Sequence, residues 1–309
     1  MDSTLNDESQ EVLENEIANL ELRLQRAKHR LAKSDTTNIN KPSLSYPSSQ
    51  SAHHYLLLLS DSALPLGSFA FSSGLESYLS HTRRGPRPGG PSFPTSTSAS
   101  ASASASPFSS FLPLSISSYA STTLPFTLAA HRDPVPDTLV ALDDALDAAI
   151  VCAVGRRASV QQGRALLAIW EKSIAAAADP RGTLVPYAEV LRAGAASGDG
   201  GKELPPPVSA HLAPLFGAVA SLCGLSLRQT AYVFMLSHVK ALVSAAVRAG
   251  LFGPYQAQRI LAGGEVQGLL TEVIAREWDT AVEEAGQSVP VMDLWIGRHE
   301  LLYSRIFNS

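Results

Sequence analysis

From Phe111 onward, apolar residues recur at spacings of three and four, and this pattern constrains the fold more than any other feature. Leu139, Leu142, Leu146 and Ile150 illustrate it. Two later groups repeat the spacing, namely Val160, Leu166, Leu167, Trp170 and Ile174, and then Ala231, Phe234, Met235, Val239, Leu242 and Ala246. Residues three and four apart lie on one side of an α-helix. We therefore predict an all-α fold, a single helical-bundle domain whose helices pack through apolar faces.

Composition narrows the class of protein. Charged residues are 17% of the 309-residue chain and the formal net charge is −4, so no general affinity for nucleic acid is expected. The two cysteines, Cys152 and Cys223, favour a reducing compartment over a disulfide framework or a zinc site. The acidic, polar start does not resemble a signal peptide, and no uninterrupted apolar run reaches the roughly 18 residues of a membrane span. We expect a cytoplasmic protein without membrane contact.

The first 52 residues are predicted to form a unit apart from the rest. Residues 8–33 carry an apolar heptad seam, made of Leu13, Ile17, Leu20, Leu24, Ala27 and Leu31. So short a seam forms only a marginal coiled coil, and the segment is either an exposed amphipathic helix or a site of weak self-association. Residues 34–52 are polar and contain prolines, which predicts a flexible linker. The helical domain is then expected to span residues 53–309.

Two internal stretches have compositions that cannot form a packed core. Residues 83–110 are of low complexity and include an alternating Ser-Ala run from Ser98 to Ser106. Residues 194–207 are rich in Gly and Pro. Both are predicted to be disordered insertions in surface loops, where added length costs little free energy.

Residues 55–79 combine a short apolar run, a dense turn and the start of a helix. Leu56–Leu59 is predicted to be a buried strand or a helix end. Asp61 and Pro65 favour a constrained turn, and Glu76 lies where the helix dipole favours an anion. The turn is either structural or a phosphate-binding loop, although the Gly-Lys-Ser/Thr ending of a phosphate loop is absent.

Several residues in the helical region are candidates for special roles. Lys240 and Arg248 lie eight apart on an apolar helix, so they either extend to solvent or form a basic ridge that faces a partner. Ser159 and Gly163 lie four apart and would let a neighbouring backbone approach closely. Pro125 is expected to kink or end its helix.

No metal site or catalytic set is predicted. His53 and His54 suggest nickel ligands, but adjacent histidines beside a linker are more often solvated, because metal sites usually need three or more ligands. A helical hydrolase that uses Ser68 and a distant histidine is an alternative. However, the residues around Ser68 do not form the Gly-x-Ser-x-Gly elbow of such enzymes.

Residues 289–309 are unusually apolar for the end of a chain, because termini are commonly polar and frayed. The apolar side chains are Trp295, Leu301, Leu302, Tyr303, Ile306 and Phe307. This tail either packs on its own domain or docks another protein. His299, Glu300 and Arg305 could form an acid–base pair with an anion binder, but no nucleophile or metal cluster accompanies them, so recognition is the preferred interpretation.

Four motifs, in this order, resemble the UreF family of urease accessory proteins. The first is Leu-Ser-Asp-Ser-Ala-Leu-Pro-Leu-Gly-Ser-Phe-Ala-Phe-Ser-Ser-Gly-Leu-Glu at residues 59–76. Residues 156–167 are similar to the second signature, although the acidic residue that often precedes it is missing. Residues 216–227 and 242–261 are similar to the third block. The tail is similar to the closing motif, with its His-Glu pair and final Arg-Ile-Phe-Asn-Ser, and we expect a eukaryotic, fungal-like member.

The resemblance implies a protein that does not itself hydrolyse urea. UreF-like proteins bridge the UreD/UreH scaffold, which sits on apo-urease, and the UreG GTPase, which carries nickel. The assembly delivers nickel to urease with GTP hydrolysis. The expected partners are therefore the UreD/UreH-type scaffold, the UreG-type GTPase, apo-urease and a second copy of this chain in a homodimer. No cofactor of its own is expected, because nickel and GTP are handled by the complex.

The resemblance also assigns candidate residues. Scaffold binding is assigned to the tail residues His299, Glu300, Tyr303, Arg305 and Phe307. A structural or GTPase-facing role is assigned to the turn residues Asp61, Ser62, Pro65, Gly67, Ser68, Ser72, Gly74 and Glu76. A basic or dimer face is assigned to Arg157, Lys240, Arg248 and Gln256. Alternatively, the chain regulates the GTPase, as an activator or a checkpoint, through an arginine supplied in trans, with Arg156, Arg157 and Arg248 as candidates.

Overall fold

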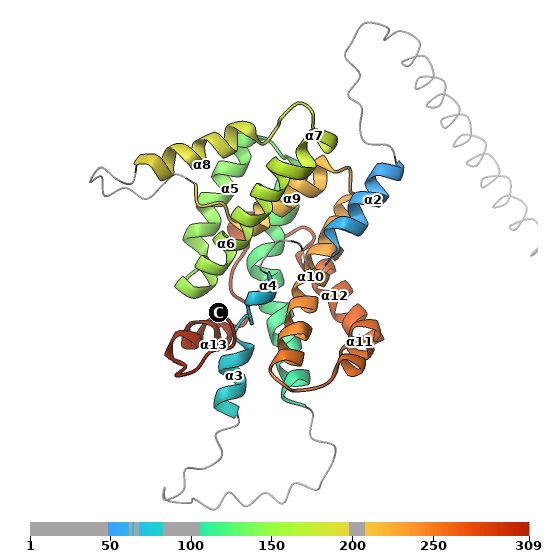
Figure 1. The fold of residues 1–309 in the computed structure, drawn as a ribbon, viewed down its shortest axis with the longest axis vertical. Coiled ribbons are helices and arrows are strands. Elements are labelled where there is room, and N and C mark those ends of the chain that lie inside the picture. The colour runs from blue at the N-terminus through green and yellow to red at the C-terminus, as the bar shows by residue number, and fades with distance from the viewer. Residues whose placement is uncertain (1–48, 62–63, 65–67, 83–105, 198–207, 309) are drawn as a thin grey trace, which may run out of the picture. The chain divides into compact units, whose positions relative to one another are not determined.

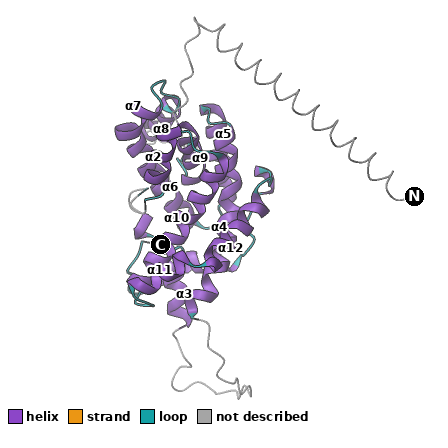
Figure 2. Ribbon diagram, turned by 90° about the vertical axis from the view of Figure 1, so that its right-hand side faces the viewer, coloured by secondary structure: helices purple, strands orange, loops and turns teal. Residues whose placement is uncertain are grey.

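A long central helix, α4 (Pro107–Arg132), organises the structure (Figure 1). The computed structural model describes residues 49–61, 64, 68–82, 106–197 and 208–308. Figure 2 shows helices and loops but no strand in these ranges, so the predicted all-α fold is confirmed there. From Ser49 onward the described residues belong to one compact unit, Pro47–Ser309. The heptad segment at residues 8–33 lies outside the described residues.

Ser106 and Pro107 fix the start of α4. The Ser106 side chain accepts a hydrogen bond from the Ser109 backbone N–H, and Pro107 occupies the first helical position, where a missing N–H costs nothing. The prediction that the low-complexity insertion continues to residue 110 is therefore wrong, since its last residues cap and begin α4. Residues 83–105 lie outside the described residues.

Helix α4 continues through Pro125 instead of ending there. Proline has no backbone N–H, so the carbonyl of Ser121, four residues earlier, loses its usual helical partner. The backbone N–H of Gly286, which lies far along the chain, donates to this carbonyl at 3.1 Å. A tertiary hydrogen bond thus replaces the missing helical one.

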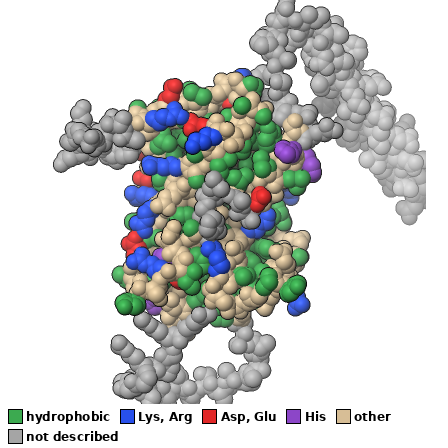
Figure 3. Space-filling view, viewed as in Figure 1, with side chains coloured by type: hydrophobic (Ala, Val, Ile, Leu, Met, Phe, Trp, Pro, Cys, Tyr) green, Lys and Arg blue, Asp and Glu red, His purple; other side chains and the backbone are tan. Residues whose placement is uncertain are grey.

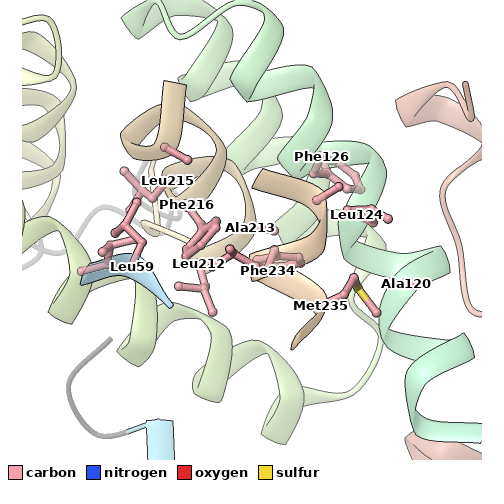
Figure 4. Packing of buried hydrophobic residues seen from close by; sticks show 14 of the residues in the cluster. Leu59, Ala120, Leu124, Phe126, Leu212, Ala213, Leu215, Phe216, Phe234 and Met235 are labelled. Atoms are coloured by element: carbon pink, nitrogen blue, oxygen red, sulfur yellow. The ribbon is translucent and has the colours of Figure 1, made fainter. Parts of the chain in front are cut away.

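Helices α9 (Leu212–Leu222) and α10 (Leu227–Arg248) pack against α4 and bury most of their apolar side chains. A Cβ atom on Gly217 would lie 2.1 Å from the Thr127 carbonyl oxygen, so glycine allows α9 to approach α4 closely. Figure 4 shows Phe216 of α9 beside Phe234 of α10, with ring centroids 5.3 Å apart. This three-helix contact is the centre of the hydrophobic core.

The remaining elements surround this core. Their bounds are α2 (Ser49–Leu59), η1 (Ser68–Ala70), α3 (Leu75–Thr82), α5 (Pro136–Ala149), α6 (Ala153–Ile169), a π-helical turn η2 (Trp170–Ile174), α7 (Ala175–Ala178), α8 (Val185–Ser197), α11 (Pro254–Ala262), α12 (Gly264–Glu277), η3 (Val282–Glu284), α13 (Val291–Arg298) and η4 (His299–Leu301). Helix α2 begins inside the predicted linker and ends with the apolar run at Leu59. Helix α8 extends to Ser197, so the predicted loop 194–207 starts too early.

In the described part of the chain, α10 is the one helix long and apolar enough to cross a membrane by length and composition. Within its most apolar window, 61% of the residues are buried inside the protein. Packing against α4 and α9 therefore accounts for its hydrophobicity, as is typical of a core helix.

Candidate functional site

The turn before α3 uses an unusual backbone conformation. Ser73 and Gly74 both have positive φ, 49° and 85°. A Cβ atom on Gly74 would lie 3.0 Å from the backbone nitrogen of Ile296 and 3.1 Å from the carbonyl carbon of Trp295. Gly74 is therefore required both for its left-handed conformation and for the close approach of α13.

Glu76 on α3 is buried, and its carboxylate binds the C-terminal tail at three points. One oxygen lies 2.9 Å from Nε2 of His299 and accepts the Phe307 backbone N–H at 3.2 Å. The other oxygen accepts the Ile306 backbone N–H at 2.7 Å. These contacts join segments that are more than 220 residues apart in sequence. The tail thus packs on its own domain, through the glutamate that ends the first motif.

Aromatic rings also pack at this contact between α3 and the tail, which we call the junction. Trp295 meets the edge of Tyr78 at a centroid distance of 5.5 Å. The guanidinium carbon of Arg248 lies 4.5 Å from the centroid of the Phe307 ring, which is a cation–π contact. Partial burial here lowers the pKa of Arg248 from its ordinary value.

Arg157 connects α6 to the tail. Its guanidinium lies 2.5 Å from Glu300, and this hydrogen bond and charge lower the pKa of the Glu300 carboxyl group. Both side chains are about half exposed, so the ion pair is expected to add little to stability.

The predicted tail residues fall into two groups. His299 and Phe307 are buried, and their burial leaves them no surface for direct contact with a partner. Glu300, Tyr303 and Arg305 are exposed. Four large apolar side chains in this region are also exposed, namely Leu294, Leu301, Tyr303 and Ile306. We call these four residues the tail surface.

The turn residues divide in the same way. Ser72 and Glu76 are buried, Asp61 is exposed, and Ser68 begins η1 on the wall of a cavity. Gly74 supports α13. Ser62, Pro65 and Gly67 lie outside the described residues.

The basic residues do not form a common ridge. Lys240 donates from Nζ to the Ser60 carbonyl oxygen at 2.6 Å, and Arg248 stacks on Phe307, so each serves a different segment of its own chain. Arg248 remains exposed, as expected for a side chain that extends to solvent, whereas Lys240 is partly buried. Gln256 is exposed on α11.

The edge of the molecule formed by α6 and α8 carries charges of both signs. Figure 3 shows Lys and Arg side chains along this edge with acidic side chains among them. Arg156 pairs with Asp147, and Arg192 pairs with Glu171. This surface is therefore mixed rather than a strong basic field.

Within the described ranges, no group of three or more His, Cys, Asp or Glu side chains is placed to hold a metal ion. His53 and His54 are exposed on α2. The hydrogen-bonding groups of Glu76 are used within the chain, where they hold the tail.

His238 was not singled out from the sequence, yet it lies on the wall of a cavity of about 310 Å³ between α10 and the turn. Its ring stacks on Tyr119 at 4.0 Å, and its Nε2 lies 3.0 Å from the Ser115 hydroxyl. Burial lowers the pKa of His238 from 6.5 to about 3. The imidazole is therefore neutral in the folded protein at ordinary pH.

This shift predicts a specific pH dependence of stability. Between pH 6.5 and about 3, the unfolded chain binds a proton at His238 that the folded chain does not. The free energy of unfolding should therefore fall as pH falls, by up to about 1.4 kcal/mol per pH unit from this residue. We expect His238→Gln to flatten the pH profile measured by urea unfolding. His54→Gln on exposed α2 is the control, and equal slopes in wild type and His238→Gln would contradict the assignment.

The fold and the junction together define a class: an all-helical protein whose C-terminal tail is held by a buried glutamate on an N-terminal turn. Comparison with known proteins identifies the family within this class. The family model UreF matches residues 103–264. A urease accessory protein UreF-like chain from Schizosaccharomyces pombe is 35% identical over 84% of this chain and 99% of its own length.

Plant and bacterial relatives agree with this match. Urease accessory protein F of Oryza sativa subsp. indica is 31% identical over 81% of this chain and 82% of its own length. Urease accessory protein UreF of Paenarthrobacter aurescens is 30% identical over 81% of this chain and 95% of its own length. The chain belongs to the UreF family of urease accessory proteins.

Proposed function

We propose that this chain is the adaptor of a urease-maturation complex. It bridges a UreD/UreH-type scaffold and a UreG-type GTPase during GTP-dependent insertion of nickel into apo-urease. It works as a cytoplasmic homodimer, has no catalytic activity and needs no cofactor of its own. The observation that supports this best is the ordered tail, because Glu76 fixes its backbone while the tail surface stays exposed.

The composition of the tail surface suits protein recognition. Tyr303 is fully exposed, and Leu301 and Ile306 are largely exposed, although they lie beside a buried hydrogen-bond network. Aromatic and Arg side chains contribute most of the energy at protein interfaces, and Arg305 lies two residues from Tyr303. A tail that is already ordered loses less conformational entropy when a partner binds.

Urease activation in cells tests the proposal directly. The cells should carry urease and the other accessory proteins but lack this chain. Restored urease activity, with nickel bound in the enzyme, is the expected result. Persistent apo-urease despite soluble expression, together with no co-purification of the scaffold from the same species, would contradict the proposal.

Tyr303→Ala is expected to weaken co-purification with the scaffold by about tenfold or more, since exposed aromatic anchors at interfaces are commonly worth at least about 1.4 kcal/mol. The stability of the free chain should stay within about 0.5 kcal/mol, because the side chain is exposed. Tyr255→Ala is the matched control, since Tyr255 is 91% exposed on α11. Equal loss of binding in both variants would show that the tail surface has no special role.

Regulation of the GTPase through an arginine supplied in trans is the alternative. The three candidate guanidinium groups are engaged within this chain: Arg156 pairs with Asp147, Arg157 pairs with Glu300, and Arg248 stacks on Phe307. These contacts favour the adaptor role. GTP turnover by the purified GTPase, with and without this chain, separates the two, because an arginine supplied in trans raises turnover by about 10³-fold or more.

A further inference from the structure

The cavity of about 310 Å³ beside His238 is lined both by apolar rings and by polar groups. Its apolar lining includes Leu212, Phe216 and Phe234, which lie close together in Figure 4. Tyr119 also lines the cavity and stacks on Phe234, with ring centroids 5.2 Å apart. Small-molecule sites in proteins have volumes of about 300 to 1,000 Å³ and combine a mostly apolar lining with a few polar groups. This cavity has the size and the lining of such a site.

The polar part of the lining is positively charged. Lys240 carries the only charge among the described residues that line the cavity, since these include no Asp or Glu and the His238 imidazole is neutral at ordinary pH. Four serines also line it, and within the described residues no protein group bonds to their hydroxyls; they are Ser68, Ser73, Ser237 and Ser244. A ligand in the cavity therefore meets one cation and several free hydroxyl groups.

The ammonium group of Lys240 is held in place by the end of α2. Its Nζ donates to the Ser60 carbonyl oxygen at 2.6 Å, and the side chain is partly buried. An ammonium group has three N–H donors, so two remain for a ligand. No carboxylate of the described residues forms an ion pair with Lys240. A partly buried cation without a counter-ion attracts an anion more strongly than a cation in open water does.

Charge and shape together select the class of ligand. A carboxylate accepts charge-assisted hydrogen bonds from an ammonium group, whereas a neutral ligand would leave the charge of Lys240 uncompensated. A flat ring can pack on Phe216 and Phe234 as aromatic rings do in protein cores, and an inorganic anion cannot. We propose that the cavity binds a small aromatic carboxylate, with the carboxylate at Lys240 and the ring against Phe216 and Phe234.

Binding of this kind involves no reaction, so it adds to the adaptor role and does not replace it. Ser68 and Ser73 belong to the turn that leads to Glu76. A carboxylate in the cavity would therefore join α10 to the segment that holds the tail. Binding is measured on this chain alone, and its outcome does not depend on whether the chain activates urease.

Fluorine NMR of 4-fluorobenzoate, titrated with the full-length chain, tests the proposal. The neutral amide of the same shape, 4-fluorobenzamide, should bind about tenfold more weakly or worse, because it has no charge to pair with Lys240. Lys240→Met keeps the apolar stem and removes the charge, and it should weaken 4-fluorobenzoate binding by about tenfold or more. Lys172→Met is the matched control, since Lys172 is exposed in η2, away from the cavity lining, and binding should not change.

A second variant covers the case in which Lys240→Met loses its fold together with the Ser60 contact. Ala241→Leu places a larger side chain on the cavity wall, keeps Lys240 and should also weaken binding by about tenfold or more. Circular dichroism shows whether each variant is folded. Weaker binding in folded Ala241→Leu, with unchanged binding in Lys172→Met, supports the proposal. No binding to the folded wild-type chain, equal affinity for the carboxylate and the amide, or unchanged binding in Ala241→Leu overturns it.

Discussion

Replacing Gly163 with alanine is expected to destabilise the domain by at least about 3 kcal/mol. A Cβ atom at this position would lie 2.1 Å from the Ala210 carbonyl oxygen and 2.6 Å from the carbonyl carbon of His211. Both atoms belong to the backbone, and Asp143 holds that backbone through three hydrogen bonds. The neighbouring segment therefore cannot move aside without breaking these bonds.

Urea unfolding followed by circular dichroism measures this effect. Gly268→Ala is the matched control, because Gly268 lies in the middle of α12 and an added Cβ would meet no atom within 4 Å. Alanine there should raise stability by up to about 1 kcal/mol through helix propensity alone. A Gly163→Ala domain within 1 kcal/mol of wild type would mean that α6 and the segment before α9 are less closely packed than described.

Replacing Glu76 with alanine is expected to cost about 3 to 5 kcal/mol and to release the C-terminal tail, the second largest effect. The substitution removes the acceptor for the backbone N–H groups of Ile306 and Phe307 and for His299. Nδ1 of His299 already has no hydrogen-bond partner within the described residues, and the substitution would also remove the partner of Nε2. Buried donors without acceptors are costly, and the tail is expected to detach.

Hydrogen exchange distinguishes detachment of the tail from general unfolding. In Glu76→Ala, the Ile306 and Phe307 amides should lose protection while amides in α4 and α10 keep theirs. Glu272→Ala on the exposed side of α12 is the control and should change neither. Retained protection at Ile306 in Glu76→Ala would show that apolar packing of Phe307 alone holds the tail.

Glu76→Ala and Tyr303→Ala together separate two ways in which the tail can serve a partner. Tyr303→Ala alters the exposed surface and leaves the tail in place, whereas Glu76→Ala releases the backbone and leaves the tail's own side chains intact. A scaffold that still binds Glu76→Ala but not Tyr303→Ala recognises the side chains of an extended tail. A scaffold that tolerates neither recognises the folded conformation.

Local sequence patterns predicted the helices well and their ends poorly. Most of the apolar residues that the spacing placed on one face are buried in α5, α6, η2 and α10, whereas Ile150 and Val160 are only partly buried. Helix α10 begins with a capping box between Ser226 and Gln229, and such a local contact can be recognised in the sequence because its partners are only three residues apart. The starts of α2 and α4 and the end of α8 were misplaced, since Ser-rich and Gly-rich composition hid short helical segments.

The hydrogen bonds from His211 to Ser159 and Asp147 show why contacts between distant segments escape sequence reasoning. Ser159 and Gly163 were recognised as a place for close backbone approach, but nothing in their spacing indicated which segment approaches. Asp147 and His211 are separated by 64 residues and two helices. Only the packing of α5, α6 and α9 brings them together.

By itself, the sequence determined the all-helical class and the family, because these depend on local spacing and on matching residues. Tertiary structure alone decided that the first motif and the tail are one site. The pairing of Glu76 with the backbone of Ile306 and Phe307 requires two distant chain segments to meet. The hydrogen bond from Gly286 to the Ser121 carbonyl, which replaces the bond lost at Pro125 in α4, likewise joins distant segments. Such bonds join atoms distant in sequence, so their partners depend on how helices pack and not on any local pattern.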